Sequence, residues 1–209
     1  MTRACRLPIG RRLPGGRGGE AGTSLVEVLT ASAVAVIVGA LSVPALTAQR
    51  GALNAAGAAR HVASLVYATR AEAVKRGVHV ALVFQPTDGG YRLAMFADGN
   101  DDGVRAADVA DGADRQVSAW VRIGDQFPGT AFGIVPGVAD PDSGTALSGS
   151  ALKIGGSSML SFGPAGGATS GTLYLRGPAS QQYAVRLLGA TGRSRLLRFD
   201  FGGRRWVAA

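Results

Sequence analysis

The chain has 209 residues, of which 46% are hydrophobic and 6% aromatic, and it contains 32 glycines. This length allows one domain plus a membrane anchor, and the many glycines favour short strands and turns over a helical bundle. The formal charge of +8 is uneven, because residues 1–22 carry +4, residues 176–209 carry +6 and the middle is slightly acidic. A single cysteine, Cys5, excludes an internal disulfide and leaves the redox compartment undefined.

An apolar run without a charged residue extends from Val28 to Ala48. As an α-helix it would rise about 32 Å, close to the hydrocarbon thickness of a bilayer. The preceding segment contains five arginines, which by the positive-inside tendency keep the start of the chain in the cytoplasm. The run therefore predicts a single membrane span, with the C-terminal domain on the outer side.

The residues before this run are Gly22-Thr23-Ser24-Leu25-Val26-Glu27. A secretory signal loses its apolar region on cleavage, whereas a cut after Gly22 would leave the apolar helix on the mature chain. Ser24 and Glu27 have the spacing of a capping box, which would give Glu27 a local role at the helix start. The alternative is a role in assembly, because a carboxylate against lipid is costly and favours a cationic partner.

This arrangement resembles the class III leader of type IV pilins and type II secretion pseudopilins. The resemblance implies that a prepilin peptidase cuts after Gly22 and methylates the new N-terminus at Thr23. It also implies that Glu27 pairs with the free amine of Thr23 on a neighbouring subunit. Pro44, the twenty-second residue counted from Thr23, stands where many pilins carry a helix-kinking proline. Thr23 and Ser24 depart from the family pattern, which has Phe or Met and then Thr.

Helical spacing of apolar residues continues from Gln49 to Gly77, and Gly77 is placed to cap the helix. The face expected to pack on the domain comprises Leu53, Val62, Leu65, Val66, Thr69 and Ala73. We expect one long helix, with residues 23–48 as its transmembrane and assembly half and residues 49–77 as its amphipathic half. Pro44 and Gly51 are the predicted positions of a bend.

After Gly77 the apolar period changes to two, and a turn at Pro86–Gly90 predicts a hairpin of Val78–Gln85 with Tyr91–Ala97. Pro136–Gly149 is rich in Gly, Pro, Asp and Ser and predicts a long loop. Further strands are expected at residues 116–123, 132–135, 152–154, 159–162, 172–176, 183–188, 196–201 and near Trp206. The fold class is therefore α+β, with the long N-terminal helix packed on an antiparallel β-sheet or β-sandwich domain at 78–209.

Four motifs narrow the resemblance to minor pseudopilins of the GspH/FimT type, which are pilin-like. They are the helix segment 67–76, the F-x-x-x-G element Phe162–Gly166, the G-T-L-x-L strand Gly171–Leu175 and the G-R-x-R motif Gly192–Arg195. The resemblance implies a non-enzymatic subunit near the tip of a type IV pilus or a type II secretion pseudopilus. Its implied partners are other pilins or pseudopilins, the prepilin peptidase, the inner membrane, and DNA or secreted cargo. An unrelated membrane-anchored β domain is the remaining alternative.

The C-terminal arginines are candidate DNA ligands. Arginines can neutralise phosphates, and an aromatic such as Trp206 could stack on an exposed base. FimT-like pseudopilins of DNA-uptake pili bind DNA through a similar G-R-x-R motif, so the resemblance implies this role for Arg193 and Arg195. The alternative is that outward arginines keep a sheet edge soluble. The full candidate set is Arg193, Arg195, Arg198, Arg204 and Arg205.

The segment Asp98–Gly103 reads D-x-N-x-D-G, like the start of a calcium loop. An EF-hand would need a glutamate at Val109, so the alternative is a different Ca²⁺ site made by Asp98, Asn100, Asp102 and Asp108. We favour a solvated turn at a hairpin tip, and hence no cofactor. His61 and His79 lack metal-ligand spacing and no nucleophile motif is present, so the sequence predicts no enzyme.

Overall fold

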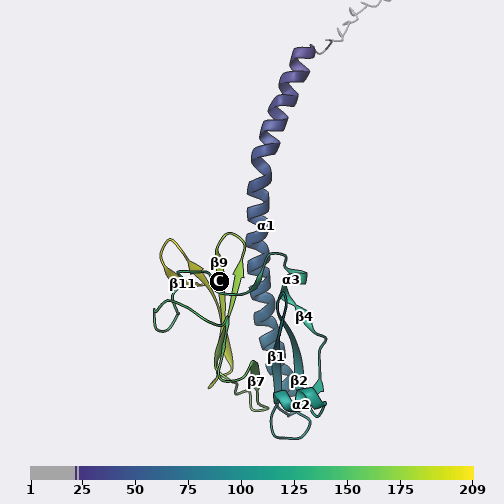
Figure 1. Cartoon of the computed structure of the whole chain (residues 1–209), viewed down its shortest axis with the longest axis vertical. Coiled ribbons are helices and arrows are strands. Elements are labelled where there is room, and N and C mark those ends of the chain that lie inside the picture. The colour runs from purple at the N-terminus through teal and green to yellow at the C-terminus, as the bar shows by residue number, and fades with distance from the viewer. Residues whose placement is uncertain (1–21, 23) are drawn as a thin grey trace, which may run out of the picture. The chain divides into compact units, whose positions relative to one another are not determined.

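The computed structural model describes Gly22 and residues 24–209. Two compact units meet between Val43 and Pro44, and helix α1 (Leu25–Arg76) contributes to both (Figure 1). Within the described residues, every strand belongs to the second unit, Pro44–Ala209. Thr23 and the rest of the predicted leader lie outside the described residues.

The part of α1 after Gly51 buries a face of small residues, including Ala55, Ala58 and Ala59, which are fully buried. Small side chains allow close approach, and the backbone at Gly177 and the ring of Phe127 pack directly against this face. Val62, Val66, Thr69 and Ala73 are buried and Leu65 partly so, as expected. The prediction for Leu53 is wrong, because this side chain is 67% exposed.

The first described sheet is antiparallel and has the order β3-β2-β1-β7, with β4 also paired to β2. Its strands are β1 (Val80–Thr87), β2 (Gly90–Ala97), β3 (Arg115–Gln116), β4 (Val121–Arg122) and β7 (Met159–Phe162). Thr87 pairs with Gly90, so the predicted turn shrinks to Asp88-Gly89. Pro86 continues β1 beyond Val83, the last residue paired with β7, and at such an edge a missing N–H costs no ladder bond.

Both faces of β1 are buried, which the expected alternation did not anticipate. Val80, Leu82 and Phe84 join the main core with α1 and the second sheet. Ala81 and Val83 join a smaller cluster on the opposite face, with Ala94, Phe96 and Met159. Other apolar residues cover each face of β1, and for this reason its sequence is a continuous apolar run.

The single strand predicted over residues 116–123 is wrong. Phe96 pairs with Gln116 and Leu93 with Val121, so β3 and β4 are separated by two extra residues. Ser118 supports this bulge, since its Oγ accepts the N–H of Met95 at 2.9 Å. Two short helices were also not predicted: α2 (Ala106–Asp111), which ends at the left-handed Gly112, and α3 (Ile123–Gln126).

The second described sheet has the order β11-β10-β9-β8-β5, with β6 paired to β8, and its pairs are antiparallel. Its strands are β5 (Ala131–Phe132), β6 (Leu152–Ile154), β8 (Gly171–Gly177), β9 (Gln181–Leu188), β10 (Arg193–Asp200) and β11 (Arg205–Ala208). The main core joins Val62 of α1, Leu82 of the first sheet and Leu175 of the second. The predicted α+β class, a long helix packed on antiparallel sheet, is confirmed (Figure 1).

Residues 133–140, which lead into and begin the predicted loop Pro136–Gly149, are fixed to the second sheet by polar contacts. Gln182 is fully buried; its Oε1 accepts the N–H of Val135 at 2.7 Å, and its Nε2 donates to the carbonyl of Gly133 at 3.1 Å. Trp206 Nε1 donates to the carbonyl of Ala139 at 2.7 Å. Burial and the neighbouring Asp140 carboxylate raise the pKa of Tyr174, whose hydroxyl therefore stays protonated. The loop is an ordered part of the β domain.

Candidate functional site

The N-terminal unit presents an apolar surface. Among the described residues, α1 is long and apolar enough to cross a membrane, and none of its apolar window is buried. Exposed side chains of this unit include Leu25, Val26, Val28, Leu29, Val34, Val36, Ile37, Val38 and Leu41. This surface is suited to lipid or to the helices of neighbouring subunits.

Glu27 is exposed on the first turn of α1, where its N–H donates to the carbonyl of Ser24 at 2.9 Å. Gly22 is exposed as well, and no other heavy atom lies within 4 Å of the position that a Cβ would take. Thr23 is outside the described residues, so the pairing of its amine with Glu27 stays a prediction. The helix runs through Pro44, but the Pro44 side chain is also outside the description, and the predicted kink stays a prediction.

A second apolar surface lies on α1 within the C-terminal unit. Leu46, Leu53, Tyr67 and Val74 are between 53% and 69% exposed. Their positions are separated by multiples of seven residues, which places them on one face of a helix. We call these four residues the apolar stripe. It lies opposite the small residues that pack on the β domain and is interrupted by the exposed Arg60, so α1 has one buried face and one exposed, largely apolar face.

Three of the family motifs meet at one point. Arg70, from the helix motif, donates through Nε to the carbonyl of Gly166 at 3.2 Å. Gly166 and Gly192 both have left-handed backbones, with φ of 82° and 61°. A Cβ on Gly192 would overlap the Gly166 carbonyl oxygen and come within 2.9 Å of Arg70 Nε. These glycines are therefore required by packing, which no local pattern could have revealed.

Arg193 and Arg195 lie exposed on β10, and strand alternation puts them on the same face. Arg195 is paired with Arg186 of β9, and Arg186 forms an ion pair with Asp142 at 2.6 Å. Sequence reasoning missed Arg186 and Asp142, because only the strand register brings them to this face. The three arginines and one aspartate form a surface with a net positive charge, which can hold an anionic group.

The other candidate arginines lie elsewhere. Arg198 lies on the opposite face of β10 from Arg193 and Arg195, and it lines a hollow with Arg60 of α1. Arg204 and Arg205 follow the far end of β10, about 23 Å from Arg193 at the usual rise of a strand. The expected stacking role of Trp206 is wrong, because its indole packs edge-on against Phe199 at 5.2 Å and bonds to the long loop. The five arginines therefore do not form one patch.

The loop that begins at Asp98 is closed by its own hydrogen bonds. Asp98 accepts backbone N–H groups of Asn100, Asp101 and Gly103 at 2.8 to 3.1 Å. Burial raises the pKa of Asp98, but these N–H bonds outweigh it and keep the pKa below its ordinary value. The loop leads into α2 rather than forming a simple hairpin tip.

Three of the proposed calcium ligands lie close together, since the side-chain amide of Asn100 is 3.0 Å from Asp98 Oδ1 and 2.8 Å from Asp102 Oδ1. Asp102 forms an ion pair with Arg105 at 2.6 Å. Burial and neighbouring aspartates raise the pKa of Asp108. In the described part of the chain, no three His, Cys, Asp or Glu side chains are placed to hold a metal ion. The Ca²⁺ site of Asp98, Asn100, Asp102 and Asp108 stays a prediction.

The two histidines occupy packing positions. His61 lies 5.7 Å from the ring of Phe127, measured between centroids, and its Nε2 is buried without a partner among the described residues. His79 packs against Gly163. Neither belongs to a group of three or more His, Cys, Asp or Glu side chains placed to hold a metal ion in the part of the chain that the structure describes.

A long helix with an exposed apolar N-terminal half and a two-sheet β domain on its C-terminal half defines a class of helix-plus-sheet proteins whose helix is long and apolar enough to cross a membrane. Residues 58–192 match the family described as type II transport protein GspH. The chain therefore belongs to the GspH family of minor pseudopilins of type II secretion. This membership overturns the alternative of an unrelated membrane-anchored β domain.

Among solved structures, the chain is similar to the minor pseudopilin EpsH from the type 2 secretion system of Vibrio cholerae. The two sequences are 15% identical, the similarity covers 69% of this chain and 97% of that chain, and the TM-score is 0.44. No curated protein matches the chain significantly.

Proposed function

We propose that this chain is a processed minor pseudopilin, assembled near the tip of a type II secretion pseudopilus. The prepilin peptidase removes residues 1–22 and methylates Thr23. Residues 23–48 hold the precursor in the inner membrane with the β domain on the periplasmic side. In the filament, α1 packs among the helices of other pseudopilins while the β domain contacts partner subunits or secreted cargo. The role is structural and involves no catalysis.

The observation that carries this proposal is the apolar surface of α1. Burying one Val or Leu side chain contributes about 1.5–3 kcal/mol, and the N-terminal unit leaves many of them exposed. The bilayer covers this surface in the precursor, and neighbouring helices replace the lipid in the filament. Leu53, Tyr67 and Val74 of the apolar stripe continue such a surface beyond the span, where lipid no longer reaches.

Glu27 supports assembly because it stands exposed at the front of the apolar run. A carboxylate carried along such a helix into a filament core is costly unless a cation meets it. The free amine of Thr23 on a neighbouring subunit would supply that cation. The pair would then fix the axial register between two subunits.

The test is the incorporation of Glu27→Ala into sheared filaments, with the membrane fraction measured in parallel. We expect Glu27→Ala to stay in the membrane and to fall at least tenfold in the filament fraction. The control is Glu72→Ala, which removes a half-buried helix carboxylate paired with Arg76 at 2.6 Å and should incorporate normally. Normal incorporation of Glu27→Ala would remove the proposed pairing.

DNA binding is the second candidate function, and the shared face of Arg193, Arg195 and Arg186 favours it. Each phosphate contact contributes to a salt-dependent affinity. If the chain acts in DNA uptake, Arg193→Ala with Arg195→Ala should weaken DNA binding at least tenfold and flatten its salt dependence. Arg204→Ala with Arg205→Ala, at the far end of β10, is the matched control. Equal DNA binding by both double variants would exclude this candidate.

A further inference from the structure

The turn between β10 and β11 lies beside the start of the extramembrane part of α1. The charge-free run ends at Ala48, and Ala52 follows one helical turn later, a rise of about 6 Å. Ala52 lines one hollow of about 310 Å³ together with Phe201 and Gly202. The headgroup layer of a bilayer adds roughly 5–7 Å on each side of the hydrocarbon. Ala48 belongs to the same unit as this turn, so a hydrocarbon boundary at Ala48 would put the turn at headgroup depth.

The side chains at this turn have the chemistry of a membrane interface. Phe201 is 40% exposed, and Arg204 and Arg205 are exposed as well. Arg50, also exposed, is the first charged residue after the apolar run. Among the described residues, none of these three arginines forms an ion pair with a carboxylate. The nearby Asp200 instead accepts the N–H of Gly202 at 3.1 Å.

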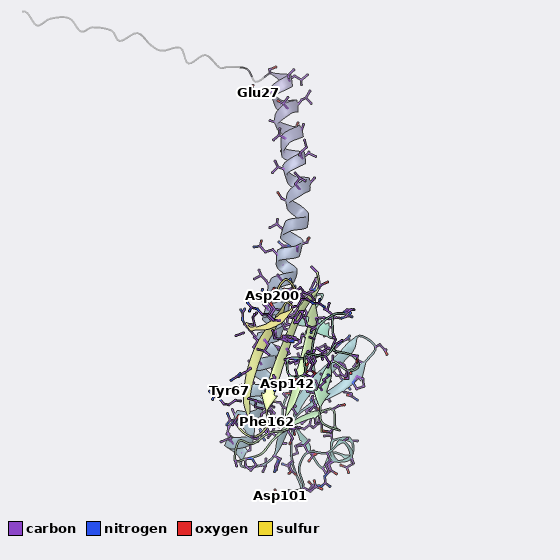
Figure 2. All side chains as sticks on the ribbon, turned by 90° about the vertical axis from the view of Figure 1, so that its left-hand side faces the viewer. Glu27, Tyr67, Asp101, Asp142, Phe162 and Asp200 are labelled. Atoms are coloured by element: carbon purple, nitrogen blue, oxygen red, sulfur yellow. The ribbon has the colours of Figure 1, made fainter. Side chains whose placement is uncertain are left out.

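The opposite end of the β domain is acidic. The segment 98–114 carries six aspartates against Arg105, and it follows β2 at the end of the domain where α1 stops. Ala52 and Arg76 are separated by about 36 Å of helix. Figure 2 shows Asp200 and Asp101 at opposite ends of the β domain. An anionic surface would therefore attract one end of this domain and repel the other.

We propose that Phe201, Arg204 and Arg205, together with Arg50, dock on the anionic lipid headgroups of the bilayer that anchors α1. This inference rests on the membrane-anchored precursor of the proposed function. Phe201 inserts its ring between headgroups while the arginines meet lipid phosphates, an arrangement typical of amphipathic side chains at interfaces. Each basic residue at an anionic surface contributes about fivefold to partitioning. The contact would hold the β domain against the periplasmic surface until the subunit leaves the membrane.

The test uses the full chain with Cys5→Ser, reconstituted in nanodiscs of phosphatidylethanolamine and phosphatidylglycerol. A nitroxide is attached at Gly202→Cys, where an added Cβ meets only Asp200 at 3.5 Å, and at Asp101→Cys as the far-end reference. Collisions with a water-soluble nickel chelate and with lipid-soluble oxygen report the depth of each label. We expect the label at 202 to be at least threefold less accessible to nickel than the label at 101.

Arg204→Gln with Arg205→Gln should raise nickel access at 202 to the level at 101, and so should discs of phosphatidylcholine alone. Arg193→Gln with Arg195→Gln removes the same charge elsewhere and should change nothing. Equal access at 202 and 101 in the unsubstituted chain would overturn the docking proposal, as would protection that persists without the two arginines, which would indicate a protein contact. A third label at Val36→Cys reports the anchor: if it is in water, the proposed membrane span itself fails.

Discussion

At the scale of single residues, Gly192 shows how a family motif can be explained by packing. Its left-handed backbone and its contact with the Gly166 carbonyl leave no room for a side chain. Arg70 closes the junction by bonding to the same carbonyl. The motif thus positions Arg193 and Arg195 at the start of β10, whatever these arginines bind.

Gly192→Ala should lower the free energy of unfolding by about 2–4 kcal/mol, because it combines backbone strain with overpacking. Gly144→Ala is the matched control, since Gly144 has φ of 68° but nothing within 4 Å of an added Cβ. That variant should lose only about 1 kcal/mol. Urea titration of the full chain in detergent, followed by tryptophan fluorescence, measures both losses, and equal losses would contradict the packing role.

Site residues could be predicted from the sequence only where they form a contiguous pattern. Gly22, Glu27 and the arginines were predicted from local patterns, because leaders, capping boxes and charge clusters are contiguous. Arg186 and Asp142 were missed because they join Arg195 only through the pairing of β9 with β10 and the path of the long loop. Trp206 was misinterpreted for the same reason, since its partner Ala139 is distant in sequence.

At the scale of elements, the long loop is held by a network centred on Asp140. Its carboxylate accepts the N–H groups of Asp142 and Ser143 at 2.9 and 3.2 Å and meets Lys153 Nζ at 3.2 Å. Burial alone would raise the pKa of Asp140, but these donors outweigh it and lower the pKa below the ordinary value. The loop therefore depends on the ionised carboxylate.

A lowered pKa in the folded state gives stability that is complete above the ordinary carboxyl pKa, about 4, and is lost as the pH falls through the lowered value. Asp140→Asn should therefore destabilise the chain at pH 7 by about 1–2 kcal/mol, and the difference should shrink below about pH 4. The free energy of unfolding measured from pH 7 to pH 3 checks this. Asp88→Asn, at the exposed hairpin tip, is the control; a difference for Asp140→Asn that does not change with pH would contradict the assignment.

Some sequence patterns predicted helices and strands correctly and others did not. The bounds predicted for β6 and β7 are confirmed, because short apolar runs between turn residues were enough to locate them. The strand predicted at 116–123 was wrong because Ser118 replaces a ladder bond at the bulge, which apolar spacing cannot show. Helix α2 was missed because its six residues are too few to show a helical period, and only Val109 packs, in part, on the smaller cluster.

At the scale of the whole molecule, hydropathy predicted the long helix and the α+β class. Both the charge-free run and the change in the spacing of apolar residues after Gly77 can be recognised from the sequence alone. The two faces of α1 were only half predicted. Its domain-facing side was right except for Leu53, which belongs instead to the apolar stripe with Leu46, Tyr67 and Val74. A helix with apolar residues on both sides has no single amphipathic pattern, so only the fold distinguishes the face that packs on its own domain from the face that stays exposed.

The proposed function requires that a polar leader is removed while the apolar helix stays on the mature subunit. The decisive measurement is mass spectrometry of the N-terminal peptide, from protein purified out of membranes that contain an active prepilin peptidase. We expect a chain that starts at Thr23 with one methyl group on its amine. A chain that still starts at Met1 in those membranes would overturn the proposed function.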